Sequence, residues 1–304
     1  MKILMFGGRG QLGSAYERYF KTHGISVEIT RVEIRDLVAV TKAITSTKPD
    51  VVLNLAARAN IDFCEENKLT AFDSNTVGAD TVGAACQKTN TYLVHMSTGC
   101  IQESLTESQA HPETDPATPL CFYSWTKLWA EQMLQHRASR HGLRVLLLRP
   151  RQLLSSELSP RNALTKMLSY NKFIDTPNSC TVVDDLLWVT EELIKRSAVG
   201  VYNVANPGVT SPYKIAEVLK EVIRPEMKFT KITKEELNGM TKSERIDAVL
   251  DCTKLNSLGI KLEPLEKRLR EVCQDLRDKI NSSEGIDLMK KVNEETAWKL
   301  GLKK

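Results

Sequence analysis

The sequence has few cysteines, and their spacing points neither to a disulfide framework nor to a zinc site. The seven cysteines are an odd number, and none of them stands in a CxxC or CxxH arrangement. This favours free thiols in a reducing compartment. The sequence also lacks an apolar run long enough to cross a bilayer, and the apolar part of the N-terminal MKILMFGG is too short for a signal peptide. We therefore expect a cytoplasmic protein without membrane contact.

A concentration of charge of one sign is missing as well. The 304 residues include 42 Lys and Arg and 38 Asp and Glu, which interleave along the chain and leave a net charge of +4. Because no dense basic stripe with aromatic residues occurs, nucleic-acid binding is not expected. The five histidines are scattered, without the spacing of metal ligands or of a Ser/His/Asp triad. We therefore expect no metal site.

What the sequence does have is a regular alternation of short apolar runs and helical patterns. Such alternation is typical of an α/β protein with a Rossmann-type, doubly wound parallel sheet, which binds ligands at the carboxyl ends of its strands. The expected strands are 2–6, 26–30, 51–55, 92–97 and 144–148, and the expected helices are 11–22, 37–47, 71–89 and 126–140.

The first expected strand leads directly into a glycine motif that opens the first helix. Gly7, Gly10 and Gly13 form the pattern GxxGxxG. Glycines at these points allow a tight turn and a close approach of a pyrophosphate, and the helix N-terminus supplies N–H groups for the phosphates. The motif predicts a dinucleotide site whose contacts come from Gly7, Gly10, Gln11, Leu12 and Gly13.

The end of the second expected strand carries an arginine where an acidic residue would bind the ribose of NAD. Arg31 can pair with the 2′-phosphate of NADP, as can Arg9 inside the glycine loop, although each alone is equally well explained as a surface arginine. Together they favour NADPH as the cofactor, with NADH as the alternative. Asp36 is a candidate for binding the adenine amino group, and an ordinary helix N-cap explains it equally well.

These patterns suggest two lobes. We expect residues 1–150 to form an NADP-binding Rossmann domain, to which residues 178–204 return. Residues 151–177 and 205–280 are expected to form a smaller C-terminal substrate-binding lobe. Residues 281–304 form a C-terminal tail with a helical pattern.

A YxxxK motif at the start of a helix supplies the predicted catalytic centre. The spacing of Tyr123 and Lys127 places phenol and ammonium on one helical face. A nearby cation lowers the pKa of a phenol, which would suit Tyr123 to give a proton to a carbonyl oxygen. The preceding strand ends in Ser97 and Thr98, and a hydroxyl there can hold the same carbonyl oxygen. Thr98 is the preferred hydroxyl and Ser97 the alternative.

This set of motifs resembles the extended short-chain dehydrogenase/reductases and, among them, the dTDP-4-dehydrorhamnose reductase family. It is more closely similar to those members that combine 3,5-epimerisation of a UDP-4-keto-6-deoxyhexose with its 4-reduction. The likeness extends to about residue 280. It is carried by the glycine loop, by Tyr123 and Lys127, and by residues 54–57, 60–65, 97–101, 160–166, 175–179 and 202–209.

The resemblance implies an NADPH-dependent reductase that makes an NDP-L-rhamnose, with a nucleotide sugar as its substrate. Thr98, Tyr123 and Lys127 would be the reductase triad, and Cys100 and Lys166 the acid/base pair for epimerisation. Two other functions remain open, a 4-reductase without epimerase activity and a non-catalytic NADP-binding regulatory subunit. The residues do not decide between UDP and dTDP.

The resemblance also implies further contacts. A homodimer would form through the helix that carries the YxxxK motif. The cofactor would contact Ala56, Ala57, Tyr123 and Lys127, and the substrate would contact Thr98 and Asn162.

Overall fold

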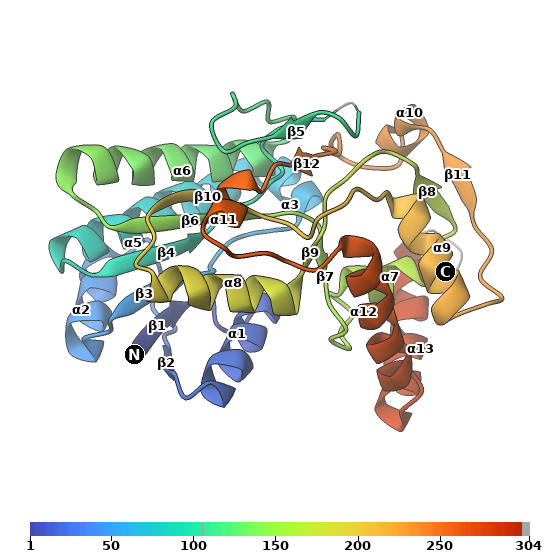
Figure 1. The fold of residues 1–304 in the computed structure, drawn as a ribbon, viewed down its shortest axis with the longest axis horizontal. Helices are drawn as coiled ribbons and strands as arrows, with labels where there is room; N and C mark the ends of the chain where they lie inside the picture. The colour runs from blue at the N-terminus through green and yellow to red at the C-terminus, as the bar shows by residue number, and fades with distance from the viewer. Residues whose placement is uncertain (105, 300–304) are drawn as a thin grey trace.

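The protein consists of a parallel sheet covered by helices on both faces, with a second lobe at one end (Figure 1). The computed structural model describes residues 1–104 and 106–299, and the side chains of all of these except residues 284 and 293–299. Six parallel strands form the sheet in the order β10-β6-β4-β3-β1-β2. The strand order reverses beside β1, as in a doubly wound sheet. The predicted α/β fold is therefore confirmed.

Most sheet-forming elements lie where the sequence predicts them. The strands are β1 (Lys2–Phe6), β2 (Ser26–Ile29), β3 (Val51–Asn54), β4 (Tyr92–Met96), β6 (Val145–Pro150) and β10 (Gly200–Val204). The helices against them are α1 (Gln11–Thr22), α2 (Leu37–Thr47), α5 (Gly78–Lys88), α6 (Phe122–His141) and α8 (Val183–Lys195).

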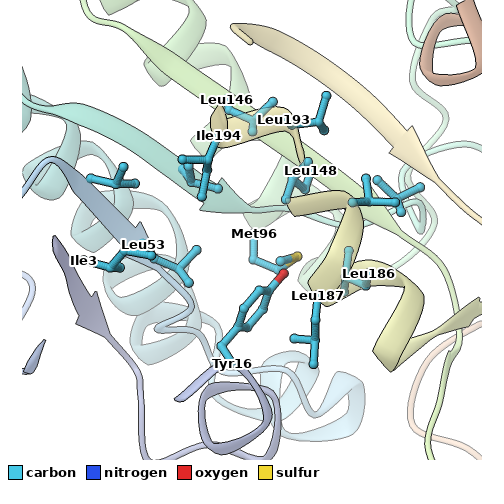
Figure 2. Packing of buried hydrophobic residues seen from close by; sticks show 14 of the residues in the cluster. Ile3, Tyr16, Leu53, Met96, Leu146, Leu148, Leu186, Leu187, Leu193 and Ile194 are labelled. Carbon is cyan, nitrogen blue, oxygen red and sulfur yellow. The ribbon is translucent and has the colours of Figure 1, made fainter. Parts of the chain in front are cut away.

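Alternate residues of each strand enter different cores because successive side chains of a strand point to opposite faces. On one face of the sheet, Ile3 belongs to a core cluster that also contains Tyr16 of α1 and Leu186 of α8 (Figure 2). Its neighbour Leu4 packs on the other face, in the cluster that includes Val82 of α5. Both faces are thus buried, which explains why the strands are apolar almost throughout.

The helix expected at 71–89 is present but contains a π-helical turn. It runs from α4 (Lys68–Phe72) through the π turn η1 (Asp73–Val77) into α5. The turn places the buried Asn75, whose amide donates to Thr126 Oγ1 at 3.0 Å and whose Oδ1 accepts from the Arg58 N–H at 2.7 Å. π turns often occur at functional sites, and this one connects the segment after β3 to the helix with the YxxxK motif.

The start of that helix was predicted incorrectly. The sequence suggested 126–140, whereas α6 begins at Phe122 after the N-cap Cys121, which makes no side-chain capping bond. Tyr123 therefore lies in the first turn and Lys127 one turn further along.

The second lobe has its own core. It contains α7 (Ala163–Met167), β8 (Lys172–Ile174), α9 (Pro212–Val222), β11 (Thr230–Ile232), α12 (Leu265–Ile280) and α13 (Ser283–Lys299). Their apolar residues form a cluster around Leu219, Leu269 and Leu276. Helix α13 lies in the tail that has a helical pattern in the sequence, of which residues 300–304 are outside the described part. Between the two lobes the chain returns to the sheet through α8 and β10, and β10 pairs with β6.

Candidate active site

The glycine loop has the close packing that a dinucleotide-binding loop requires. Gly7 has a φ of +77°, and a Cβ there would lie 2.5 Å from the Ala56 nitrogen. A Cβ on Gly13 would lie 2.5 Å from Gly8 Cα. Helix α1 begins behind Gly10, and no side chain caps its N-terminus. The loop therefore fits the pyrophosphate of a dinucleotide, with the helix N–H groups as donors.

The side chains predicted to select the cofactor lie on the surface. Arg31, just after β2, and Arg9, in the glycine loop, are exposed, and neither forms an ion pair with another described residue. Asp36 is the N-cap of α2 and accepts from the Ala39 N–H at 2.9 Å. The alternative reading of Asp36 as a helix cap is thus confirmed, while its contact with adenine stays a prediction.

The two hydroxyls at the end of β4 have different surroundings. Ser97 is buried and donates a hydrogen bond to the carboxylate of Glu131 on α6. Thr98 accepts from the Cys100 N–H at 3.1 Å, and its side chain lowers the pKa of the neighbouring Tyr123 phenol. Because the Ser97 hydroxyl already donates its hydrogen bond to Glu131, Thr98 is the better placed of the two to hold a carbonyl oxygen.

Tyr123 does not have the lowered pKa that the sequence suggested. Burial raises the pKa of Tyr123, the nearby Cys100 raises it further, and the hydrogen bond with Thr98 opposes the shift. The net effect in the folded protein is a raised pKa. The prediction of a lowered phenol pKa is therefore wrong, and Tyr123 is a neutral proton donor.

The amino group of Lys127 is directed to the strand beneath the helix. The side chain is only 2% exposed. Its Nζ donates to the Met96 carbonyl oxygen at 2.6 Å and lies 3.3 Å from His95 Nε2. Burial lowers the pKa of Lys127 to about 8, although Glu131 opposes the shift. Lys127 can therefore gain or lose a proton near neutral pH.

Cys100 has a cationic neighbour that sequence reasoning missed. Arg151, just after β6, donates from Nη1 to the Cys100 sulfur at 3.0 Å. Its Nη2 donates to Asn178 Oδ1 and to the Ile246 carbonyl oxygen, and Asn178 is held in turn by Asp247 at 2.8 Å. The guanidinium is thus fixed from two other segments. Cys100 thus has a fixed guanidinium as the hydrogen-bond donor to its sulfur.

The other two predicted residues lie in the second lobe. Lys166 is half-buried on α7, and its approach to the Cys100 side of the site stays a prediction. Asn162 is the N-cap of α7. Its Oδ1 accepts from the Leu164 N–H, and its Nδ2 donates to the carbonyl oxygens of Ser155 and Glu157. The polar atoms of the buried Asn162 side chain are thus hydrogen-bonded within its own loop, where they stabilise the loop conformation. A contact of Asn162 with the substrate stays a prediction.

A buried ion pair joins the catalytic helix α6 to strand β6. Glu131 receives hydrogen bonds from Arg149 Nε and Nη2, the shortest of 2.6 Å, and the two side chains are 0% and 6% exposed. Tyr123, Lys127 and Glu131 follow one another at intervals of four residues, so they share one face of α6. That spacing is a sequence signal that could have identified Glu131.

The fold and the glycine loop together define a Rossmann-type α/β protein with a dinucleotide-binding loop. Residues 1–278 match the family model for the RmlD substrate binding domain, and the chain belongs to this family, that of the dTDP-4-dehydrorhamnose reductases.

Similar proteins include two from Arabidopsis thaliana. A bifunctional dTDP-4-dehydrorhamnose 3,5-epimerase/dTDP-4-dehydrorhamnose reductase is 33% identical over 84% of this chain and 86% of its own length. A trifunctional UDP-glucose 4,6-dehydratase/UDP-4-keto-6-deoxy-D-glucose 3,5-epimerase/UDP-4-keto-L-rhamnose-reductase is also 33% identical over 84% of this chain, which spans 39% of that relative's length.

Solved structures show the same fold. The UDP-rhamnose synthase from Acanthamoeba polyphaga mimivirus is similar with a TM-score of 0.83 and 28% identity, over 90% of this chain and 99% of the viral one. A dTDP-4-dehydrorhamnose reductase from Clostridium acetobutylicum has a TM-score of 0.81 at 24% identity, over 93% of this chain and 100% of its own. In the part of the chain that the structure describes, no helix has the length and apolar character of a membrane span.

Proposed function

We propose that this protein reduces the 4-keto group of a nucleoside-diphosphate 4-keto-6-deoxyhexose with NADPH and also epimerises the sugar at carbons 3 and 5. The observation that carries the proposal is the meeting of Thr98, Cys100 and Tyr123 at the carboxyl end of β4. The names of the Arabidopsis relatives and of the viral structure support the substrate class.

In the reductase step, the protein holds the carbonyl oxygen and supplies a proton to it. NADPH, bound by the glycine loop with Arg31 and Arg9 near its 2′-phosphate, would supply the hydride. The Thr98 hydroxyl orients the 4-keto oxygen, and the Tyr123 O–H gives it the proton. The neutral phenol suits this role because it carries the proton that the product needs.

In the epimerase step, a base removes a proton from a carbon beside the keto group and an acid returns one on the opposite face. The C–H electron pair becomes that of an enolate, whose oxygen stays at Thr98 and Tyr123. Cys100 and Lys166 would be the acid/base pair. The contact between Arg151 and Cys100 supports this assignment, since a guanidinium stabilises a thiolate that has yet to accept its proton.

The two lobes would bind different ligands. Residues 1–150, together with residues 178–204, would bind the dinucleotide, and residues 151–177 and 205–280 would bind the nucleotide sugar. We further propose a homodimer through α6, which presents Trp125 and Met133 to solvent at 41% and 39% exposure.

The decisive experiment is incubation of the protein with UDP-4-keto-6-deoxyglucose in deuterated buffer without NADPH, followed by NMR of the recovered sugar. Deuterium should enter at carbons 3 and 5. In Cys100→Ala, exchange at one or both carbons should stop, while reduction of an already epimerised 4-keto sugar should survive. If the wild-type protein shows no exchange but reduces the epimerised sugar, it is a 4-reductase alone. If it neither exchanges nor reduces, the whole proposal fails.

A further inference from the structure

A polar chain is buried beneath the catalytic helix, where the surrounding strands are apolar. His95 lies on β4, two residues before Ser97, and is 1% exposed. Its Nδ1 is 3.2 Å from Asn54 Nδ2, and its Nε2 is 3.3 Å from Lys127 Nζ. The reductase step described above uses neither His95 nor Asn54.

The orientation of the Asn54 amide is fixed by the backbone. Its Oδ1 accepts from the Ala56 N–H at 3.1 Å. If the amide were reversed, its NH2 group would face that N–H, and two donors would meet. The NH2 group must therefore face the His95 ring, so His95 Nδ1 is an acceptor and carries no proton.

This fixes the tautomer of the ring. A neutral imidazole carries one proton, and here it must be on Nε2, which faces Lys127. An ammonium on Lys127 would place two donors against each other at this contact. A neutral amine has a lone pair that accepts from Nε2–H, and it can still donate to the Met96 carbonyl oxygen.

The charges around the pair do not disturb this arrangement. Glu131 is one turn along α6 from Lys127, but its carboxylate accepts from Arg149 and Ser97. Burial lowers the pKa of His95 far below its ordinary value, and the neighbouring Lys127 lowers it further. Burial also lowers the pKa of Lys127 to about 8. Both groups are therefore neutral in the free protein at mildly alkaline pH.

We propose that Asn54 and His95 are positioning residues that hold Lys127 as a neutral amine in the free protein at mildly alkaline pH, so that Lys127 takes up a proton there when the reduced dinucleotide binds. The proton uptake rests on the proposed function, because the anionic dinucleotide favours the ammonium. The tautomer does not depend on it. At that pH Lys127 is therefore uncharged in the free protein and charged in the complex.

The tautomer is tested by NMR of the free protein with ¹⁵N-labelled histidine, in which His95→Gln identifies the His95 signals. Nitrogen shifts should show Nε2 protonated and Nδ1 bare. Asn54→Asp has nearly the same shape, and its Oδ1 can still accept from the Ala56 N–H. Its other carboxylate oxygen can only accept a hydrogen bond from the ring, so the imidazole should change to the tautomer that is protonated on Nδ1. Asn60→Asp, at an exposed helix N-cap that aspartate also suits, is the matched control and should leave the ring unchanged. The proposal is overturned if the wild-type His95 ring is protonated on Nδ1, or if its tautomer is unchanged in Asn54→Asp.

The proton uptake is measured by calorimetry of NADPH binding at roughly pH 9 in buffers of different ionisation enthalpy. Wild type should take up roughly one proton per site, and Lys127→Met should take up none. Asn54→Asp should take up much less than wild type because its Lys127 is already an ammonium. Binding without proton uptake in the wild type overturns this inference and leaves the proposed function intact. Absence of any NADPH binding contradicts the proposed function, while the NMR result still decides the tautomer.

Discussion

The guanidinium of Arg151 donates a hydrogen bond to the thiol of Cys100 at 3.0 Å. The two residues are 51 positions apart in the chain and follow neighbouring strands, β6 and β4. The contact therefore results from the parallel sheet, which brings the carboxyl ends of adjacent strands to one edge. It places a fixed cation beside the proposed epimerisation base.

Replacing Arg151 should slow the epimerase step more than the reductase step. In Arg151→Met the thiolate loses its charge-assisted donor, worth about 1.5–3 kcal/mol, so deuterium exchange should fall about tenfold to a hundredfold. Reduction of an already epimerised sugar should change less, and Arg151→Lys should retain part of the exchange. The exposed Arg161→Met is the matched control. Equal losses in both steps would show that Arg151 serves the site as a whole.

Tyr123→Phe should abolish reduction and leave the binding of NADPH nearly unchanged. The variant lacks the proton donor, and general acid catalysis is worth about a hundredfold to ten-thousandfold. Single-turnover oxidation of NADPH measures the loss, and fluorescence titration measures binding. Tyr170→Phe, whose side chain is 43% exposed, should behave as wild type. Unimpaired turnover in Tyr123→Phe would end the mechanism given above.

Arg31→Ala should reduce the preference for NADPH over NADH by about tenfold to a hundredfold. The variant removes a charged hydrogen-bond donor to the 2′-phosphate, worth about 1.5–3 kcal/mol. The ratio of kcat/KM for the two cofactors measures the effect. Arg35→Ala is the control, since Arg35 pairs with Glu33 and Asp73. An unchanged ratio in Arg31→Ala would remove Arg31 from the cofactor site.

Lys127 should make the protein more stable as the pH rises above about 8. Its pKa in the folded protein, about 8, lies below the ordinary value of 10.5. Between these values the unfolded chain binds a proton that the folded protein does not, so the free energy of unfolding increases with pH. The Lys127 contribution should rise by about 2 kcal/mol between about pH 8 and 9.5, and it is absent below pH 8. Urea unfolding of wild type and Lys127→Met across this range measures the difference, and parallel curves would contradict the lowered pKa.

Trp125→Lys should dissociate the proposed homodimer. Trp125 is 41% exposed on α6 and packs against Trp129 with a ring separation of 5.6 Å. A lysine there would bring like charges together across a twofold interface. Analytical ultracentrifugation measures the change. Trp188→Lys on α8, where the tryptophan is 39% exposed, should leave the assembly unchanged, and a monomeric wild type would refute the dimer.

The sequence predicted the sheet well because its inner strands are buried on both faces and its first helices have clear apolar stripes. It missed the start of α6 because Cys121 gives no capping signal. The π turn at Asp73–Val77 was also missed, because an inserted residue leaves no distinct pattern in a helical segment that continues on both sides.

The active site was predictable only where its residues are close in the sequence. Tyr123 and Lys127 lie one turn apart on the same helix, and Thr98 and Cys100 follow the end of the same strand. Arg151 and Asn178 could not be assigned because Arg151 reaches Cys100, and Asn178 reaches Arg151, only after distant segments have folded together. The raised pKa of Tyr123 was likewise hidden, because it depends on how deeply the phenol is buried.

The pairing of β10 with β6 has a consequence for the order in which the chain folds during synthesis. The sheet lacks its last strand until residue 204 has emerged from the ribosome, by which time residues 151–177 have already been made. Until then β6, whose six residues are all buried in the finished protein, is an unprotected sheet edge. A nascent chain that ends near residue 150 therefore exposes an apolar strand to pairing with other chains. This edge closes only after the intervening residues 151–177 have been made and β10 has paired with β6.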